Sequence, residues 1–86
     1  MPTATVLIYT TPFCGYCAAA KSLLNKKAVD YKEIDISGDE PMREKLITIT
    51  GRTSVPQIFI NDEHIGGFDD MAALDSAGEL DPRLGL

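Results

Sequence analysis

Residues 5–17 read TVLIYTTPFCGYC, a short hydrophobic run that ends shortly before a pair of cysteines. The run itself, from Thr5 to Thr10, is rich in β-branched and aromatic side chains, which predicts a β-strand. Thr11-Pro12-Phe13 breaks this pattern, and the segment from Cys14 to about Lys27 is rich in alanine, leucine and lysine, which predicts a helix. The two cysteines therefore lie where a strand gives way to the N-terminus of a helix.

The only cysteines of the chain form the sequence Cys14-Gly15-Tyr16-Cys17, a C-x-x-C pair. Unpaired N–H groups and aligned peptide dipoles at a helix N-terminus favour negative charge, so we expect Cys14 to be partly thiolate near neutral pH. The thiolate is the attacking species in disulfide exchange. Cys17, about one turn along, is placed to displace whatever becomes bonded to Cys14. The pair therefore predicts a redox-active dithiol.

Three other interpretations of this pair are a structural disulfide, a zinc site and two inert core thiols. A disulfide would close so short a loop that the chain-entropy model gives it only ~2 kcal/mol. A closed zinc site needs four ligands, and His64 is the only histidine, so dimerisation or an external ligand would have to complete the shell. Free cysteines are often buried, yet Pro12, Gly15 and Tyr16 favour an exposed turn. The redox interpretation is favoured over all three.

The composition is that of one small globular domain spanning residues 1–86. Hydrophobic residues make up 44% of the chain and charged residues 24%, so disorder is not expected. Met1-Pro2-Thr3-Ala4 does not have the form of a signal peptide, and no apolar run approaches membrane-spanning length. We therefore expect a cytoplasmic protein without a membrane partner, in which a C-x-x-C pair is catalytic.

The net charge of −5 is unevenly distributed along the chain. Lysines fall in the first part and acidic residues crowd the last part: Lys21, Lys26, Lys27 and Lys32, against Asp62, Glu63, Asp69, Asp70, Asp75, Glu79 and Asp81. No basic stripe is present, so we expect no nucleic-acid partner. Most of these charges are expected to be solvated.

The remaining elements are predicted from periodicity and from turn residues. Tyr31 to Ile36 alternates as a half-solvated edge strand does, whereas residues 5–10 and Gln57 to Ile60 are apolar on both sides, as central strands covered by helices on each face are. A second helix is expected from near Pro41 to about Thr50, where Gly51 ends it. The predicted features that follow are a hairpin turn at Asn61-Asp62, a short strand ending at Gly66-Gly67, and a third helix from about Asp69 to Ala77 closed by Gly78.

The predicted order β-α-β-α-β-β-α implies an α/β domain with a mixed sheet and helices on both faces. In the first helix, the side chains expected to face the core are Leu23, Leu24 and the alanines. The cysteine pair lies beyond the carboxyl end of the first strand, where open α/β sheets place their ligand sites. Neither G-x-G-x-x-G nor a P-loop occurs, so nucleotide binding has no support.

Four short motifs together resemble the glutaredoxin family, in particular its small dithiol members of bacterial type. They are Cys14-Gly15-Tyr16-Cys17, residues 51–60 (GRTSVPQIFI), residues 65–70 (IGGFDD) and Leu80-Asp81-Pro82, and they span nearly the whole chain. The resemblance implies a thioredoxin-like fold: a four-stranded mixed sheet of order 2-1-3-4 with three helices. It also implies a monomeric, glutathione-dependent thiol-disulfide oxidoreductase that acts on disulfide-containing or glutathionylated proteins.

By the same resemblance, Cys14 takes up glutathione as a mixed disulfide and Cys17 is the resolving thiol. The residues expected to bind glutathione are Thr11, Tyr16, Arg52, Ser54, Val55, Pro56, Gly67, Phe68, Asp69 and Asp70. Tyr16 would flank the tripeptide, and a cis Val55–Pro56 bond would leave the Val55 backbone free to pair with it. The residues alone favour a trans bond, because only ~5% of X-Pro bonds are cis.

The charged ends of glutathione are also assigned by the resemblance. Gly66-Gly67 would let the backbone approach the ligand, and the helix N-terminus that follows would bind the γ-glutamyl carboxylate. Asp69 or Asp70 would meet the γ-glutamyl ammonium, although either is equally suited to be an N-cap. Arg52 would pair with the glycyl carboxylate or remain solvated. His64 has no role in this assignment and is expected to be a surface hairpin residue.

Two positions depart from the family pattern. Many relatives carry lysine where this chain has Thr11, so activation of Cys14 must depend on the helix end. Many dithiol relatives carry proline where this chain has Gly15, which leaves the first turn less constrained. Some members without that proline hold a [2Fe-2S] cluster between two subunits, with Cys14 and glutathione as ligands. Such a glutathione-ligated dimer, acting in cluster binding or delivery, is the alternative function; otherwise no metal site is expected.

Overall fold

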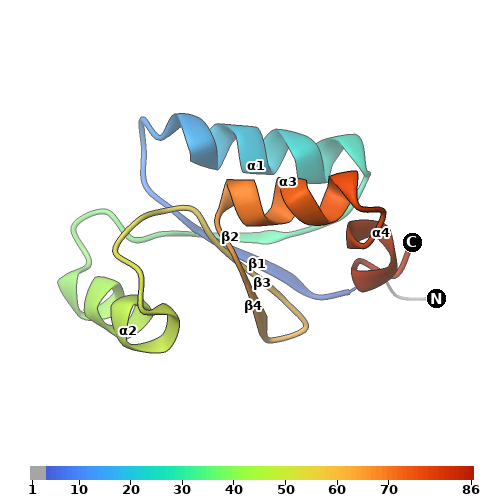
Figure 1. Cartoon of the computed structure of the whole chain (residues 1–86). Helices are drawn as coiled ribbons and strands as arrows, with labels where there is room; N and C mark the ends of the chain where they lie inside the picture. The colour runs from blue at the N-terminus through green and yellow to red at the C-terminus, as the bar shows by residue number, and fades with distance from the viewer. Residues whose placement is uncertain (1–3) are drawn as a thin grey trace.

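A four-stranded sheet forms the centre of the computed structural model, which describes residues 4–86 (Figure 1). The elements in chain order are β1 (Val6–Thr10), α1 (Gly15–Lys26), β2 (Lys32–Asp35), α2 (Glu40–Thr50), β3 (Gln57–Ile60), β4 (Glu63–Gly66), α3 (Phe68–Ser76) and α4 (Leu80–Arg83). The sheet order is β2-β1-β3-β4, with β2 parallel to β1 and the other neighbours antiparallel. The predicted mixed sheet of order 2-1-3-4 is therefore confirmed.

The strand pairing follows from the sequence pattern. Ile8, at the centre of β1, lies opposite Glu33 on one side and Ile58 on the other, so β1 is interior and β2 is the predicted edge strand. The β3–β4 hairpin turns at Asn61 and Asp62, whose φ angles are 50° and 67°. Asparagine and aspartate tolerate this left-handed conformation better than other non-glycine residues do. The hairpin was predicted at these two residues.

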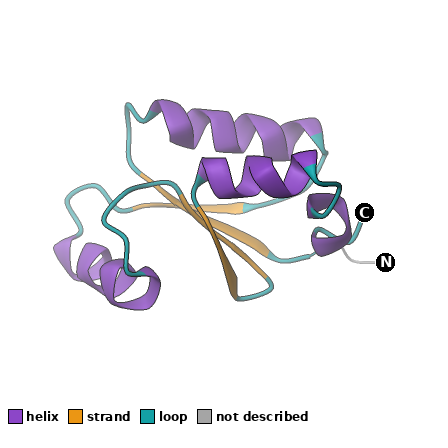
Figure 2. Ribbon diagram, viewed as in Figure 1, coloured by secondary structure: helices purple, strands orange, loops and turns teal. Residues whose placement is uncertain are grey.

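One face of the sheet carries the hydrophobic core. Helices α1 and α3 cover this face together (Figure 2). The buried side chains packed between them and the sheet are Val6, Ile8, Ala20, Leu24, Val29, Ile58, Ile60, Met71, Leu80 and Leu84. The chain thus places the N-terminal end of α1, and with it the cysteine pair, beside the end of β1.

Helix α2 lies on the opposite side of the sheet from α1 and α3, as predicted, but it leaves part of that face open (Figure 1). Leu7, Tyr9 and Phe59 are only half-buried there, with the Tyr9 and Phe59 rings packed edge to face at 5.7 Å. Helix α2 stands apart from α1 and α3 and buries only Leu46 (Figure 2). Its N-cap is Asp39, and it ends at Gly51 in the left-handed conformation, φ 70°, as predicted.

Three further details correct the sequence analysis. A fourth, short helix, α4, follows α3 and closes one end of the core with Leu80 and Leu84; its Pro82 is tolerated because first-turn N–H groups need no helical partner. Helix α1 begins at Gly15, so Cys14 is its N-cap rather than its first residue. Ala18 is exposed, whereas Ala20 faces the core.

No helix among residues 4–86 is both long enough and apolar enough to cross a membrane. Residues 1–3, part of the segment that was judged not to be a signal peptide, lie outside the described residues.

Candidate active site

Cys14 lies at the N-terminal tip of α1, where its Sγ accepts a hydrogen bond from the Cys17 N–H at 3.2 Å. This N–H is one of the first-turn groups that have no partner within the helix. The Cys14 sulfur thus lies at the positive end of the helix dipole and is held there by this hydrogen bond. Cys14 is half-buried, while Phe13 and Tyr16 beside it are exposed. The tip therefore presents one accessible sulfur between two aromatic side chains.

Cys17 has a different environment although it lies only one turn away. Its side chain is 2% exposed, and burial, followed by a hydrogen bond with Cys14, raises the pKa of Cys17 to about 11. A backbone hydrogen bond at Thr11 and the Lys21 ammonium oppose this rise. Both cysteines are free thiols. The residues of the expected exposed turn, Pro12, Gly15 and Tyr16, are exposed around a half-buried Cys14. Cys17 is buried and stays protonated at neutral pH.

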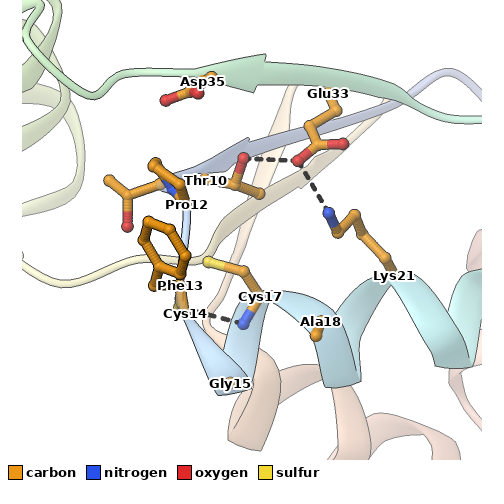
Figure 3. A pocket seen from close by; sticks show the side chains of 11 residues that line it. Thr10, Pro12, Phe13, Cys14, Gly15, Cys17, Ala18, Lys21, Glu33 and Asp35 are labelled. Carbon is orange, nitrogen blue, oxygen red and sulfur yellow. Dashed lines mark hydrogen bonds and ion pairs between the residues drawn. The ribbon is translucent and has the colours of Figure 1, made fainter.

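A cavity of about 530 Å³, here called the thiol cavity, lies beside both sulfurs (Figure 3). Glu33 on β2 forms its far wall, where its Oε2 accepts hydrogen bonds from the Thr10 hydroxyl at 2.7 Å and from the Lys21 ammonium at 3.0 Å. These two bonds lower the pKa of Glu33, so the carboxylate is ionised at neutral pH. Thr11 lines this cavity. The cavity thus brings the two thiols close to a fixed ion pair.

A second hollow, of about 250 Å³, lies at the same end of α1 and is here called the Arg52 groove. Its lining residues are Tyr16, Arg52, Ser54, Val55, Pro56, Gly67, Phe68, Asp69 and Asp70. These are nine of the ten residues assigned to glutathione; the tenth, Thr11, lines the thiol cavity instead. The Val55–Pro56 peptide bond is cis, as the resemblance implies.

An ion pair spans the Arg52 groove. Arg52 Nη1 lies 2.7 Å from Asp70 Oδ2, which also accepts the Gly67 N–H at 2.9 Å. The Arg52 guanidinium, followed by the Gly67 bond, lowers the pKa of Asp70. We assigned these two side chains to opposite ends of glutathione, and in the free chain they pair with each other. Asp69 is exposed and makes no such contact among the described residues.

Gly66 makes room for the Asp70 carboxylate. A Cβ at position 66 would lie 2.6 Å from Asp70 Cγ, and its φ of 123° is one that side-chain-bearing residues rarely adopt. A Cβ at Gly67 would instead make an ordinary 3.5 Å contact with the Pro56 carbonyl. Gly66 therefore serves the hydrogen bond at the start of α3, whereas Gly67 is the glycine that lines the Arg52 groove.

The Arg52 groove adjoins the Cys14 sulfur. The Cys14 thiol donates to the Val55 carbonyl at 3.8 Å, and the Tyr16 ring lies 6.4 Å from the Phe68 ring. A ligand in the groove would therefore lie beside the Cys14 sulfur.

His64 was expected at the surface, and the structure corrects this expectation. It is half-buried, its ring packs on Phe59 at 5.1 Å, and its Nε2 lies 2.7 Å from Gln57 Oε1. Gln57 is 1% exposed and donates from Nε2 to the Ser54 carbonyl at 2.9 Å. A signal was present in the sequence: Gln57 is a polar residue in the otherwise apolar run QIFI, so it needs a partner when buried.

Within residues 4–86, no three histidine, cysteine, aspartate or glutamate side chains are grouped to hold a metal ion. Cys14 is the one partly accessible thiol that a single chain offers there, because Cys17 is buried. An iron-sulfur cluster would therefore need a second chain and external thiolates.

Comparison with known proteins agrees with this geometry. Residues 6–65 match the family model described as Glutaredoxin. The chain is 53% identical over 81 residues to Glutaredoxin 3 of Escherichia coli (strain K12), covering 94% of this chain and 98% of that protein. It is 49% identical over 79 residues to a glutaredoxin of Pseudomonas aeruginosa, covering 92% and 94% respectively.

Solved structures show the same fold. A buckwheat glutaredoxin–glutathione complex superposes with a TM-score of 0.90 at 28% identity, over 95% of this chain and 77% of that one. The holo form of glutaredoxin C1 from Populus tremula x tremuloides gives a TM-score of 0.90 at 32% identity, over 95% and 84%. Both share the thioredoxin-like arrangement of sheet and helices.

Proposed function

Since this chain belongs to the glutaredoxin family and is a thiol-disulfide oxidoreductase, we propose that glutathione is its electron donor. The observation that carries the proposal is the position of the Arg52 groove. Val55 lines this groove, and the Val55 carbonyl contacts the Cys14 sulfur. The buckwheat relative was crystallised as a complex with glutathione, which supports the same ligand here.

The proposed reaction with a glutathionylated protein uses Cys14 alone. The Cys14 thiolate attacks the glutathione sulfur, a Cys14–glutathione disulfide forms, and the protein sulfur leaves as a thiolate that takes up a proton. A second glutathione thiolate then attacks the glutathione sulfur of this mixed disulfide. The products are the reduced protein thiol, glutathione disulfide and a free Cys14 thiolate. One free glutathione is consumed as reductant, because the other half of the glutathione disulfide comes from the substrate.

A protein disulfide requires the second thiol. Cys14 attacks one sulfur of the substrate and forms a mixed disulfide with it. Cys17 then loses its proton and attacks Cys14, which releases the substrate as a dithiol and leaves a Cys14–Cys17 disulfide for glutathione to reduce. Burial of Cys17 suits this order, because a buried thiol does not compete for the first attack.

In the Arg52 groove, we propose that each part of glutathione meets the residue assigned to it by the family resemblance. The Val55 backbone would pair with the tripeptide backbone, while Tyr16 would flank it. Arg52 would bind the glycyl carboxylate with the N–H groups that Asp70 leaves free. The N-terminus of α3 would receive the γ-glutamyl carboxylate, and Asp69 or Asp70 the ammonium.

The test is reduction of a glutathionylated small molecule with glutathione as the only electron source. We expect turnover coupled to formation of glutathione disulfide, at a rate that saturates with the glutathionylated substrate. Turnover supported only by a thioredoxin-type reductase, with no response to glutathione, would contradict the proposal. The proposed setting is the cytoplasm, with disulfide-containing or glutathionylated proteins as substrates.

A glutathione-ligated [2Fe-2S] dimer is the second candidate function. It is favoured by the single accessible thiol per chain and by Gly15, whose surroundings are open. One Cys14 and one glutathione thiolate from each of two subunits would give four sulfur ligands. Reconstitution with iron, sulfide and glutathione under argon should give a brown dimer, and Gly15→Pro should lower its yield while sparing oxidoreductase activity. A colourless monomer in the wild-type sample would contradict this candidate.

A further inference from the structure

Gln57 is a fully buried polar side chain in an otherwise apolar strand. It is 1% exposed, yet both ends of its amide have partners: Nε2 donates to the Ser54 carbonyl at 2.9 Å, and Oε1 lies 2.7 Å from His64 Nε2. A buried amide is costly unless it is hydrogen-bonded. Here the bonds connect strand β4 to the segment that lines the Arg52 groove.

The chemistry of the partners fixes the direction of these bonds. The Ser54 carbonyl can only accept, so the amide nitrogen of Gln57 faces it and the amide oxygen faces His64. His64 Nε2 must therefore carry a proton and donate. Packing on Phe59 at 5.1 Å holds the ring. Burial, with the Arg52 cation as a second cause, lowers the pKa of His64, so the ring is neutral at pH 7.

The Ser54 carbonyl and the Val55 N–H belong to one peptide group. The group is planar, and its C=O and N–H point in opposite directions because the bond is trans. A hydrogen bond that fixes the Ser54 oxygen therefore also fixes the direction of the Val55 N–H. Since Gln57 holds the oxygen, the N–H points away from Gln57. Val55 lines the Arg52 groove, and its own carbonyl contacts Cys14.

We propose that His64 and Gln57 are positioning residues for glutathione: His64 holds the Gln57 amide, which fixes the Ser54 carbonyl and so aims the Val55 N–H at the bound tripeptide. The inference rests on the proposed glutathione-dependent function and extends it to two residues outside the groove lining. Neither side chain touches the ligand. Their contribution is to binding, and the chemistry at Cys14 does not depend on them.

The direct test is His64→Phe, which keeps an aromatic ring against Phe59 and removes the donor. We expect the KM for a glutathionylated substrate to rise about fivefold, the typical cost of one lost hydrogen bond. The kcat and the rate of Cys14 alkylation by a small neutral reagent should stay within twofold of wild type. His64→Gln, which can donate from its amide nitrogen, should restore most of the affinity.

Glu63→Gln is the matched control. Glu63 precedes His64 on β4, pairs with Arg83 at 2.8 Å and is not among the residues that line the Arg52 groove. This variant should leave KM unchanged even if it lowers the melting temperature. A KM that rises equally in His64→Phe and Glu63→Gln would mean that general destabilisation is responsible, and it would overturn the inference.

NMR on the wild-type protein gives a readout that needs no substitution. His64 is the only histidine, so its imidazole signals are unambiguous. Addition of S-methylglutathione, which cannot react with Cys14, should shift the Nε2–H resonance. Unchanged imidazole signals together with an unchanged KM in His64→Phe would overturn the inference. The proposed function would survive that result if the wild-type protein still turns over with glutathione and Arg52→Ala raises KM. If wild type shows no glutathione-dependent turnover and Arg52→Ala leaves KM unchanged, the proposed function itself is rejected.

Discussion

The thiol cavity and the Arg52 groove meet at the N-terminal end of α1, yet they are built from different parts of the chain. The thiol cavity is lined mainly by residues 10–21, with Glu33 and Asp35 from the edge strand. The Arg52 groove takes residues from three separated segments and contains neither sulfur. We therefore expect sulfur chemistry at the thiol cavity and ligand recognition in the Arg52 groove. The two adjoin at Tyr16, which lies between the cysteines, and at the contact between Cys14 and the Val55 carbonyl.

The largest change in activity should appear when each thiol is removed in turn. Cys14→Ser should abolish all disulfide exchange, because the accessible sulfur at the helix tip is lost. Cys17→Ser should keep turnover on glutathione mixed disulfides and lose reduction of protein disulfides. Both substrates are assayed side by side with each variant. Equal losses in the two variants would remove the distinction between nucleophile and resolving thiol.

The ionisation of Cys17 should respond to Cys14 in a defined direction. The pKa of Cys17 in the reduced chain is about 11, so its thiolate fraction should rise about tenfold per pH unit from pH 7 to 9. In Cys14→Ser the charge of Cys14 is gone, so the pKa of Cys17 should fall. It should still lie above the ordinary value for a thiol, because burial is the largest cause. Thiolate absorbance against pH measures this; a Cys17 already ionised at pH 8 in that variant would contradict the assigned burial.

The Arg52 groove is tested by comparing two neighbouring carboxylates. Asp70→Asn removes the charged partner of Arg52 and weakens the bond to the Gly67 N–H, so KM for a glutathionylated substrate should rise about tenfold with little change in kcat. Asp69→Asn is the comparison, since Asp69 is the other candidate for the γ-glutamyl ammonium but is exposed and makes no ion pair among the described residues. An effect of Asp69→Asn as large as that of Asp70→Asn would show that the Arg52–Asp70 pair does not organise binding.

Thr11→Lys should give the smallest effect and should act on the thiol side. A cation there would stand in the thiol cavity near Cys14, so alkylation of Cys14 at pH 6 should accelerate about threefold. The gain should shrink at high salt, because the site is partly exposed. We expect the gain in glutathione affinity to be smaller than the gain in alkylation rate, because Thr11 does not line the Arg52 groove. If neither rate nor affinity changes, Thr11 does not act on Cys14.

Most of the fold followed from local signals in the sequence. Strand β3 occupies the predicted residues 57–60, and Gly51 ends α2 as expected, because periodicity and positive-φ turn residues are local properties. Helix α4 was missed because four residues around a proline give too little periodicity to read. The half-open second face of the sheet was missed because the apolar pattern of β1 does not say how far α2 stands from it.

In the site too, features built from adjacent residues were predicted, and features that join distant residues were not. The cysteine pair and its helix end were evident from residues 5–17, since adjacent positions determine that geometry. The Lys21–Glu33 and Arg52–Asp70 pairs were not, because they join residues that are far apart in sequence and meet only in the folded chain. His64 was misjudged for the same reason: its partner Gln57 lies on another strand. The glutathione-binding roles came from the family resemblance and stay predictions.

Trapping the mixed disulfide is the most direct test of the central claim, that Cys14 carries glutathione held in the Arg52 groove. Cys17→Ser is incubated with glutathione disulfide, digested without reductant and analysed by mass spectrometry. The account predicts one glutathione per chain, attached to Cys14, and less of it in the double variant with Asp70→Asn under limiting glutathione disulfide. No adduct at Cys14, or equal adduct formation with and without Asp70, would contradict it.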